Sequence, residues 1–487
     1  MLRIHLVLVP PVIKGKFAEL GEGLTPPLGI LSIASYLRAR MNGVEIKVTD
    51  GLLEGFTRTA EIVSSWKPHI VGLSFNTPVA NSAYALFETL RSSLPEAILV
   101  AGGAHTTSLP DEVLTKSKAD IAVIGEGEET FLAIVKTLAG AEKIDKRELF
   151  GLNGIAFAEG GKVTVNPIAP YIPELDSIQF PARDLVDMKR YSGWYLTKKK
   201  PETTMLFSRG CAYQCVFCSN KVWNVSQPCL RFRSPANIAD EIVSLNEEFG
   251  IKEVFDNSDE FNNSLSHAKE VCREMIKRNL RIPWKTQLRV WPLDDELASL
   301  MAAAGCWYVH LGIESASQRT LDGVKKKITI EQAIEACRIL KRYKIKVLGL
   351  FMLFNIWEEN EVPVFEGIAE SRATLDFAGK LIRKGLINYM GWSITMPYPG
   401  SPLYDIALRN NLIKDGLAGN WDAWLREEFS VIKLPGITDK DIARLKTRGS
   451  VLRALAMIRS GGFGLSDAGY IMKKLMRIVA NEIPFIK

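Results

Sequence analysis

The chain has 487 residues, of which 47% are hydrophobic and 24% are charged. These values are ordinary for a soluble globular protein and exclude a disordered or fibrous one. The longest strongly apolar run, 347–357, has 11 residues. A membrane-spanning helix needs about 20, so an integral membrane protein is excluded. The first residues, MLRIHLVLVPPV, lack the small-residue cleavage site of a signal peptide and are typical of a buried strand. We therefore expect a cytoplasmic protein of roughly two to four domains.

The net charge of +6 comes entirely from the C-terminal part of the chain. From Asp439 onward there are ten Lys or Arg and four Asp or Glu, which leaves 51 charges of each sign in the first 438 residues. A nucleic-acid-binding domain carries a basic patch or stripe of its own, so we expect no nucleic-acid partner. The basic segment indicates either peripheral contact with an anionic membrane or the solvated face of a helix.

Short apolar runs alternate with helical patterns over residues 1–140. The runs of strand length are IHLVLVP, VEIKVTD, HIVGLSF, AILVAGG and IAVIGEG, and the helical segments between them include 27–40 and 80–94. Continuous apolar strands joined by crossover helices predict a parallel sheet that is covered on both faces. We expect a Rossmann-like, doubly wound α/β domain with a ligand at the carboxyl ends of its strands.

Small and polar residues follow three of these strands, at the edge where a ligand is expected. They are Ser74, Asn76, Thr77, Gly102, Gly103, His105, Gly125, Glu126 and Gly127. Glycines let the backbone approach a bound group, and helix N-termini attract phosphate. The first strand is followed by VPPVIKGKF and not by GxGxxG, so a nicotinamide dinucleotide is not expected. The pattern favours a ligand-binding domain over a purely structural one.

Three of the seven cysteines lie within eight residues, as Cys211, Cys215 and Cys218. The odd total in a large chain argues against a disulfide framework. Thiolates suit zinc or an iron–sulfur cluster. A structural zinc usually needs a second CxxC or HxxxH pair, which this sequence lacks. Three ligands on a [4Fe-4S] cube leave one iron open, so we interpret the loop as an iron–sulfur site, with zinc or buried thiols as alternatives.

These motifs resemble the radical S-adenosylmethionine (SAM) enzymes that carry a cobalamin-binding domain, the subfamily of class B methyltransferases and anaerobic porphyrin cyclase-like proteins. PPLGILSIASYLR, AGGAHTTSLPDEVL and ADIAVIGEGEETF are similar to the cobalamin-binding domain. The cysteine loop and the six strand–helix alternations behind it resemble the partial (β/α)6, TIM-like barrel, whose site lies at the carboxyl ends of the strands.

The resemblance implies three cofactors: a [4Fe-4S] cluster held by the three cysteines, SAM bound to the open iron, and cobalamin. The DxHxxG motif, whose His binds cobalt in other cobalamin proteins, is absent. Relatives without it either hold cobalamin with no histidine ligand or have a degenerate domain that binds none. We expect bound cobalamin, with its nucleotide tail in the sheet near Gly102, Gly103 and Gly127.

The resemblance also implies contacts to SAM. Relatives place an aromatic residue before the third cysteine near the adenine, carboxylates after the second strand at the amino group, and a Glu-Ser pair after the fourth strand at the ribose. A guanidinium after the third strand could pair with the SAM carboxylate. The matching residues are Phe217, Asp256, Asp259, Glu260, Gln287, Arg289, Glu314 and Ser315. The stretch FMLFNIWEENE departs from the usual Gly-rich exit of the fifth strand.

We divide the chain into four parts: a cobalamin-binding domain (1–140), a proline-rich linker (141–200), a radical SAM barrel (201–405) and a helical, basic C-terminal region (406–487). The C-terminal helices form an amphipathic surface that caps the substrate cavity or meets lipid, the latter making the protein membrane-associated, or they pack on the barrel.

The function expected from the resemblance is methylation of an unactivated carbon of a small-molecule or lipid-like substrate. The alternative is cyclisation, rearrangement or carbon–carbon coupling without net methyl transfer. Methylthiolation of tRNA is disfavoured, because that family binds a further cluster through N-terminal cysteines and this chain has none before Cys211. An electron donor such as flavodoxin or ferredoxin is the expected protein partner.

Overall fold

The computed structural model describes residues 1–11, 24–138, 146–191, 193, 196–425 and 430–460. The N-terminal sheet has the strand order β2-β1-β3-β4-β5-β6-β7. Its strands are β1 (Leu2–Leu8), β2 (Val44–Asp50), β3 (Ile70–Ser74), β4 (Ile98–Gly102), β5 (Ile121–Val123), β6 (Ile155–Glu159) and β7 (Lys162–Val165). The first five are parallel, which confirms the Rossmann-like architecture predicted from the apolar runs.

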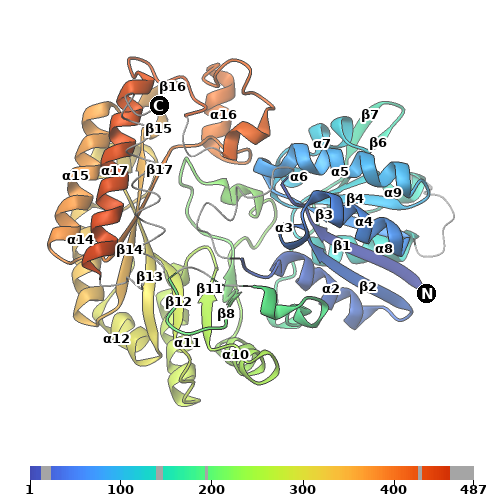
Figure 1. Cartoon of the computed structure of the whole chain (residues 1–487), viewed down its shortest axis with the longest axis horizontal. Coiled ribbons are helices and arrows are strands. Elements are labelled where there is room, and N and C mark those ends of the chain that lie inside the picture. The colour runs from blue at the N-terminus through green and yellow to red at the C-terminus, as the bar shows by residue number, and fades with distance from the viewer. Residues whose placement is uncertain (12–23, 139–145, 192, 194–195, 426–429, 461–487) are drawn as a thin grey trace, which may run out of the picture.

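Helices cover both faces of this sheet (Figure 1). They are α2 (Leu28–Arg40), α3 (Gly51–Glu54), α4 (Phe56–Trp66), α5 (Ala80–Ser93), α6 (Ala104–Ser108), α7 (Pro110–Lys116), α8 (Gly127–Leu138) and α9 (Lys146–Leu149). Neighbouring residues of β3 separate the two faces: Ile70 packs with α2 and α8, while Val71 packs with α4 and α5. Burial on both faces is the reason why these strands are continuously apolar.

The predicted linker contains regular structure that the sequence analysis missed. Strands β6 and β7 form a hairpin, and β6 pairs antiparallel with β5, so this part of the chain extends the N-terminal sheet. The hairpin turns at Gly160 and Gly161, both with positive φ, a backbone that glycine adopts without strain. The signal was therefore present in the Gly-Gly pair, although proline-rich sequence surrounds it.

The second sheet has six parallel strands in the order β17-β14-β13-β12-β11-β8, which confirms the predicted partial barrel. The strands are β8 (Glu202–Met205), β11 (Glu253–Asp256), β12 (Trp284–Arg289), β13 (Cys306–Glu314), β14 (Lys346–Leu353) and β17 (Tyr389–Ile394). The helices between them are α10 (Pro235–Phe249), α11 (Leu265–Lys277), α12 (Asp295–Ala303), α13 (Gln318–Gly323), α14 (Ile330–Arg342) and α15 (Ile368–Arg383). Their apolar faces and the outer faces of the strands form one large core.

Two short antiparallel strand pairs interrupt the alternation of strand and helix. Strands β9 (Ser208–Arg209) and β10 (Arg231–Phe232) pair antiparallel and close the cysteine-containing segment into a loop, residues 210–230, called the cysteine loop below. Strands β15 (Ile356–Glu359) and β16 (Val362–Phe365) form a second hairpin at the exit of the fifth barrel strand. This hairpin stands where FMLFNIWEENE departs from the family pattern.

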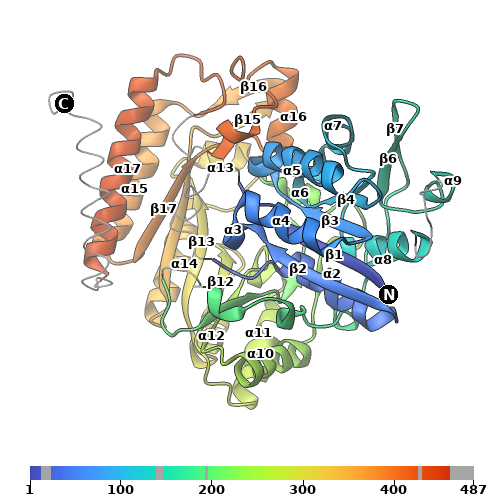
Figure 2. The same ribbon diagram turned by 45° about the vertical axis from the view of Figure 1, so that its right-hand side comes forward.

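The C-terminal part joins the two sheets. It contains α16 (Pro402–Arg409), the 3-10 helix η7 (Trp421–Leu425) and α17 (Asp439–Arg459). Trp421 and Trp424 are buried in an apolar cluster that includes Phe75 and Leu86 of the N-terminal domain. Helix α17 packs on α15 and β17 (Figure 2), which favours ordinary packing on the barrel for this helix.

In the parts of the chain described above, no helix is long and apolar enough to cross a membrane. The solvent side of α17 carries the exposed residues Val451, Leu455 and Ile458. The rest of the basic tail, residues 461–487, lies outside the described residues, so its expected contact with lipid stays a prediction.

Candidate active site

The cysteine loop lies between the N-terminal sheet and the barrel (Figure 1). Cys211 and Cys215 are buried and Cys218 is half-buried, and all three are free thiols. The loop contacts the C-terminal end of α13, the helix that follows the fourth barrel strand. Val216 N donates to Val324 O over 3.0 Å, and Cys215 Sγ lies 3.9 Å from Lys325 O. Burial raises the pKa of Cys211 to about 12 and that of Cys218 to about 11 in the metal-free chain.

The three thiols of the cysteine loop interact with one another. Cys218 interacts electrostatically with both Cys211 and Cys215, which places the three sulfurs near one another. Within the described ranges, however, no three Cys, His, Asp or Glu side chains converge closely enough to hold one metal ion. In a four-iron cube each thiolate binds a different iron.

The other four cysteines are also free thiols. Cys272, Cys306 and Cys337 are buried in the barrel core, as expected for small hydrophobic side chains. Cys229 is half-buried near the neck of the loop, where its carbonyl closely approaches Gly210.

Arg289 is poised for an anionic ligand. It is 1% exposed at the end of β12, and its guanidinium lies 3.5 Å from the centroid of the Tyr213 ring in the cysteine loop. Among the described residues, none of its three side-chain nitrogens makes a hydrogen bond of good geometry, although the guanidinium interacts with the thiol of Cys215. The nearest carboxylate oxygen, Glu260 Oε1, is 4.0 Å away. A buried guanidinium whose hydrogen-bonding capacity is unused is costly, so this site fits a ligand that carries a carboxylate.

The two acidic residues beside Arg289 differ in their surroundings. Glu260 Oε2 is buried without a hydrogen-bond partner in the described structure, and burial raises the pKa of Glu260. Burial also raises the pKa of Asp259, against a backbone hydrogen bond from Gly210. A bound ammonium group would favour the charged form of either carboxyl.

Asp256 has a structural role in the described fold. Its Oδ1 accepts from Phe207 N and from the backbone and hydroxyl of Ser258, and its Oδ2 accepts from Thr286 Oγ1 over 2.8 Å. These bonds connect β8, β11 and β12, and both oxygens of the carboxylate accept hydrogen bonds within the protein. Gln287, by contrast, is half-buried and bonds only to Asn257 at 3.1 Å among the contacts described.

Glu314 forms a buried ion pair with Lys326, with 2.9 Å between Glu314 Oε1 and Lys326 Nζ. A Cβ on Gly312 would lie 2.7 Å from Glu314 Oε1 and 2.8 Å from Lys326 Nζ, so the pair packs directly against this glycine. The neighbouring Ser315 is buried and accepts from Ser317 N. Phe217 is half-buried and packs on the apolar cluster that joins the domains.

A cavity of about 340 Å³ lies where the carboxyl ends of the two sheets face each other. The N-terminal domain contributes Ser74, Gly102, Gly103, Gly125, Glu126 and Gly127 to its lining. The barrel side contributes Leu206, Ser208, Arg209, Gly210, Asn257 and Asp259. A Cβ on Gly102 would meet nothing within 4 Å, so this glycine opens directly onto the cavity.

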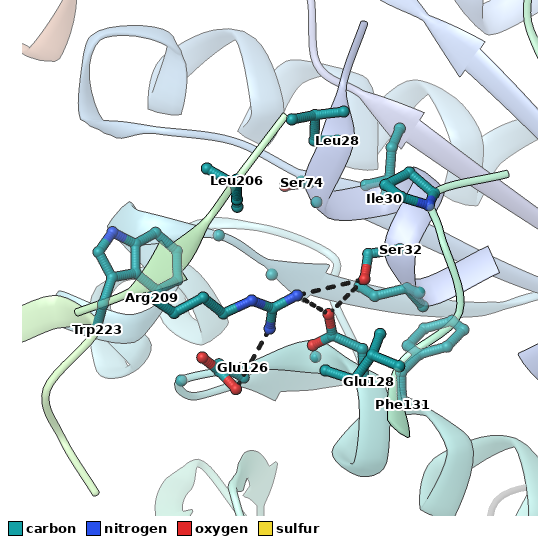
Figure 3. A pocket seen from close by; sticks show the side chains of 18 of the residues that line it. Leu28, Ile30, Ser32, Ser74, Glu126, Glu128, Phe131, Leu206, Arg209 and Trp223 are labelled. Carbon is teal, nitrogen blue, oxygen red and sulfur yellow. Dashed lines mark hydrogen bonds and ion pairs between the residues drawn. The ribbon is translucent and has the colours of Figure 1, made fainter. Parts of the chain in front are cut away.

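Figure 3 shows the charged side of the cavity. Arg209 Nη2 lies 2.7 Å from Glu128 Oε1, and Arg209 Nη1 lies 3.3 Å from Glu126 Oε2. Ser32 of α2 also donates to Glu128 Oε1 over 2.7 Å. The charges of Arg209, Glu126 and Glu128 are thus paired with one another, whereas Asp259 lines the cavity without an ion pair in the described structure, and most of the wall is apolar.

Three predicted ligand residues lie away from this cavity. Asn76 is exposed, and Thr77 and His105 are buried in contact with each other. His105 also bonds to Tyr84 OH at 2.9 Å and packs edge-on against Trp421. None of the five histidines lines the cavity. This agrees with the missing DxHxxG motif and offers no imidazole to a group bound there.

Arg209, Arg231, Glu128, Tyr213 and Lys326 belong to the site although the sequence analysis did not select them. Most are recognised only through a partner distant in the chain, as Arg231 is through Glu126, 105 residues away, whereas Lys326 is paired with Glu314 only 12 residues before it. The one local signal is the position of Arg209, directly before the Gly210-Cys211 start of the loop.

Comparison with known protein families matches two parts of the chain. The B12 binding domain matches residues 19–135, and the Radical SAM superfamily matches residues 205–365.

An uncharacterized methyltransferase of Pyrococcus horikoshii is 31% identical over 485 residues, which cover 97% of each chain. The anaerobic magnesium-protoporphyrin IX monomethyl ester cyclase of Rubrivivax gelatinosus is 31% identical over 392 residues, 78% of this chain and 66% of the cyclase. Among solved structures, a radical SAM methyltransferase from Kitasatospora setae with tryptophan substrate and a SAM analogue has the same fold. Its TM-score is 0.66, with 19% identity over 84% of this chain and 76% of that one.

Proposed function

The chain belongs to the B12-binding radical SAM enzymes, and we propose that it methylates an unactivated carbon of a small-molecule or lipid-like substrate. Its cofactors are those of the family: a [4Fe-4S] cluster, SAM and cobalamin. When bound, the reduced cluster supplies the electron that cleaves SAM to a 5′-deoxyadenosyl radical, and cobalamin supplies a methyl carrier. The observation that carries the proposal is the shared cavity, because the carboxyl ends of both sheets open onto it.

The residues of the barrel side fit the cluster and SAM. Cys211, Cys215 and Cys218 would hold three irons of the cluster. Arg289 would bind the SAM carboxylate, since the nitrogens of its buried guanidinium make no hydrogen bond of good geometry in the described structure, and Glu260 would accept from the amino group. The oxygen of Glu314 that does not face Lys326 remains for the ribose.

The residues of the N-terminal side fit part of a cobalamin. Small-molecule pockets usually measure about 300–1,000 Å³. At about 340 Å³ the cavity has room for a nucleotide tail and not for a whole corrin. Gly102, Gly103 and Gly127 line it, which supports the expected route of the tail into the sheet. With no histidine in the lining, a cobalt at its mouth would lack a protein imidazole ligand.

The alternative function is cyclisation or rearrangement without net methyl transfer. The similarity to the Rubrivivax gelatinosus cyclase supports this alternative. That cyclase is 31% identical to this chain, the same identity as the methyltransferase relative, although the matched stretch is shorter. A hydrophobic substrate fits either reaction. A radical SAM enzyme also needs a reductant, and we propose flavodoxin or ferredoxin for this role.

The products of SAM decide between the two reactions. The protein is reconstituted anaerobically with iron, sulfide and hydroxocobalamin, desalted, reduced and given SAM. A methyltransferase should form about one S-adenosylhomocysteine per bound cobalamin even without substrate, together with 5′-deoxyadenosine. Formation of 5′-deoxyadenosine alone would favour the cyclase-type reaction.

Iron content provides the matched control for that experiment. The variant with Ala at positions 211, 215 and 218 should lose its iron and all SAM cleavage, whereas Cys229→Ala should keep both. Iron retained in the triple variant, or a wild type that prefers one zinc, would contradict the proposed function at its first step.

A further inference from the structure

The cysteine loop is closed at its neck by two arginines that face each other. In the β9–β10 ladder Arg209 is directly opposite Arg231. Like charges at opposite positions of a ladder repel and destabilise it. Here both side chains contact one carboxylate: Arg209 Nη1 lies 3.3 Å from Glu126 Oε2, and Arg231 Nη1 lies 3.0 Å from the same oxygen. Arg231 Nη2 bonds to the other oxygen, so its contact with Glu126 is bidentate.

That carboxylate comes from the other domain. Glu126 lies in the loop between β5 and α8 of the N-terminal sheet, and Glu128, two residues later, is the second partner of Arg209. All four side chains are largely buried, from 3% exposed for Arg231 to 21% for Arg209. Although burial opposes it, Arg209 holds the pKa of Glu128 below its usual value, so the carboxylate stays charged.

The same loop of the N-terminal domain touches the cysteine loop beyond its neck. A Cβ added to Gly125 would lie 3.2 Å from Val225 Cγ2, which shows how closely the two loops approach. Tyr171 OH accepts from Val225 N over 3.0 Å and donates to Trp223 O. The N-terminal domain and Tyr171 of the segment that follows it therefore hold the cysteine loop at both its base and its outer part.

Residues on both sides of this contact line the cavity. Gly125, Glu126, Gly127 and Glu128 contribute one wall, and Arg209 with Gly210 contributes the facing one. Figure 3 shows Arg209 reaching across to the two glutamates. A group that enters the cavity meets the two glutamates on one wall and Arg209 on the other. Its binding therefore depends on the position of the β9–β10 pair that forms the neck of the cysteine loop.

We propose that Glu126 is a positioning residue that, through Arg209 and Arg231, fixes the cysteine loop relative to the cavity and so couples cobalamin binding to cluster assembly. The inference rests on the proposed function, since it takes cobalamin as the cavity's ligand. A buried ion pair is weak evidence for stability by itself. Coupling is a different property, because cobalamin and the cluster should each tighten the binding of the other by the same factor.

The experiment measures that factor. The dissociation constant of hydroxocobalamin is determined by equilibrium dialysis on the full chain before and after cluster reconstitution. In the wild type, reconstitution should lower it at least about 5-fold, the lower end of typical coupling factors. In Glu126→Gln, which keeps the shape of the side chain and loses its charge, the two constants should agree within about 2-fold. Asp184→Asn breaks an exposed ion pair with Arg38, away from the cavity, and should keep the wild-type ratio.

A second variant guards against a general loss of structure. Arg231→Gln removes the bidentate contact while leaving Arg209 with both glutamates, and it should also bring the ratio toward 1. A merely structural contact would change iron content or thermal stability without changing the ratio. Equal ratios in the wild type and Glu126→Gln would overturn the inference alone. A wild type that binds no hydroxocobalamin in either state would overturn the proposed function and the inference together.

Discussion

The guanidinium of Arg289 stacks on the ring of Tyr213, with 3.5 Å between Arg289 Cζ and the ring centroid. Tyr213 lies between the first two cysteines of the loop, and Arg289 ends the third barrel strand. The contact therefore orients a buried cation beside the cluster loop before any ligand arrives. Such stacking contributes about 0.5–2 kcal/mol and leaves the edge of the guanidinium free to bind a carboxylate.

The first prediction concerns this arginine. Arg289→Met should weaken SAM binding about 10- to 150-fold, since a charge-assisted hydrogen bond contributes about 1.5–3 kcal/mol. Its iron content should stay at the wild-type level, because Arg289 is no cluster ligand. Tyr213→Phe keeps a ring under the guanidinium and should bind SAM nearly as the wild type does. Equilibrium dialysis of SAM against the reconstituted wild type and the two variants measures the three affinities. An unchanged affinity in Arg289→Met would remove the residue from the SAM site.

The second prediction concerns the opening at Gly102. This residue ends β4, has no positive φ, and an added Cβ would project into open space. Gly102→Leu should therefore fold normally while filling the cavity, and retention of hydroxocobalamin after desalting should fall at least about 10-fold. Gly102→Ala adds one methyl group and should have a smaller effect. Cluster assembly should be the same in both variants. Full retention of corrin by Gly102→Leu would place the cofactor elsewhere.

Parts of the molecule that rest on local pattern were predictable from the sequence. The parallel strands of both domains are continuous apolar runs, and the spacing of Cys211, Cys215 and Cys218 is itself a local signal. The two-residue strands β9 and β10 have no such signal, because they form only when the chain returns after the cysteine loop. The β15–β16 hairpin was missed for a similar reason, as its apolar strands read as a continuation of β14.

Contacts between distant residues account for the differences between the predicted site residues and the cavity lining. His105 follows a strand end, which made it a candidate ligand residue, but Trp421 of the C-terminal part covers it. Nothing in the sequence near His105 indicates a tryptophan more than 300 residues away. The pairing of Glu126 with Arg231, and of Arg289 with Tyr213, likewise depends on how the domains dock. Sequence patterns located the strand ends, and tertiary packing decided which of them face the cavity.

The third prediction separates two roles of Glu314. Glu314→Ala leaves Lys326 buried without its carboxylate, a change that typically costs about 3–5 kcal/mol of stability. The double variant Glu314→Ala, Lys326→Met removes both charges and should recover most of that loss. If Glu314 also binds the SAM ribose, the affinity for SAM should stay low in the double variant. Urea unfolding and SAM dialysis on the same proteins make the comparison, and recovery of SAM affinity together with stability would assign Glu314 a structural role only.

The fourth prediction concerns Glu366, which lies just after the β15–β16 hairpin and is 2% exposed. Asn355 donates to its Oε2 from both the backbone, at 2.8 Å, and the side-chain amide, at 2.6 Å. Burial is the largest influence and raises the pKa of Glu366 from 4.5 to about 7. Between these values the folded protein keeps a proton that the unfolded chain has lost. The stability that this proton contributes is complete below pH 4.5 and is lost as the pH rises to 7.

Glu366→Gln imitates the protonated side chain at every pH. Its stability relative to the wild type should therefore increase as the pH rises. One pKa unit corresponds to about 1.4 kcal/mol, so the free energy of unfolding of the variant relative to the wild type should increase by roughly 3 kcal/mol between pH 4.5 and pH 8. Urea unfolding of both proteins across this range measures the difference. Glu335→Gln, which changes an exposed carboxylate paired with Arg338, should show no such trend. A difference between Glu366→Gln and the wild type that stays constant with pH would mean that Glu366 is already ionised in the folded protein, held by the two hydrogen bonds from Asn355.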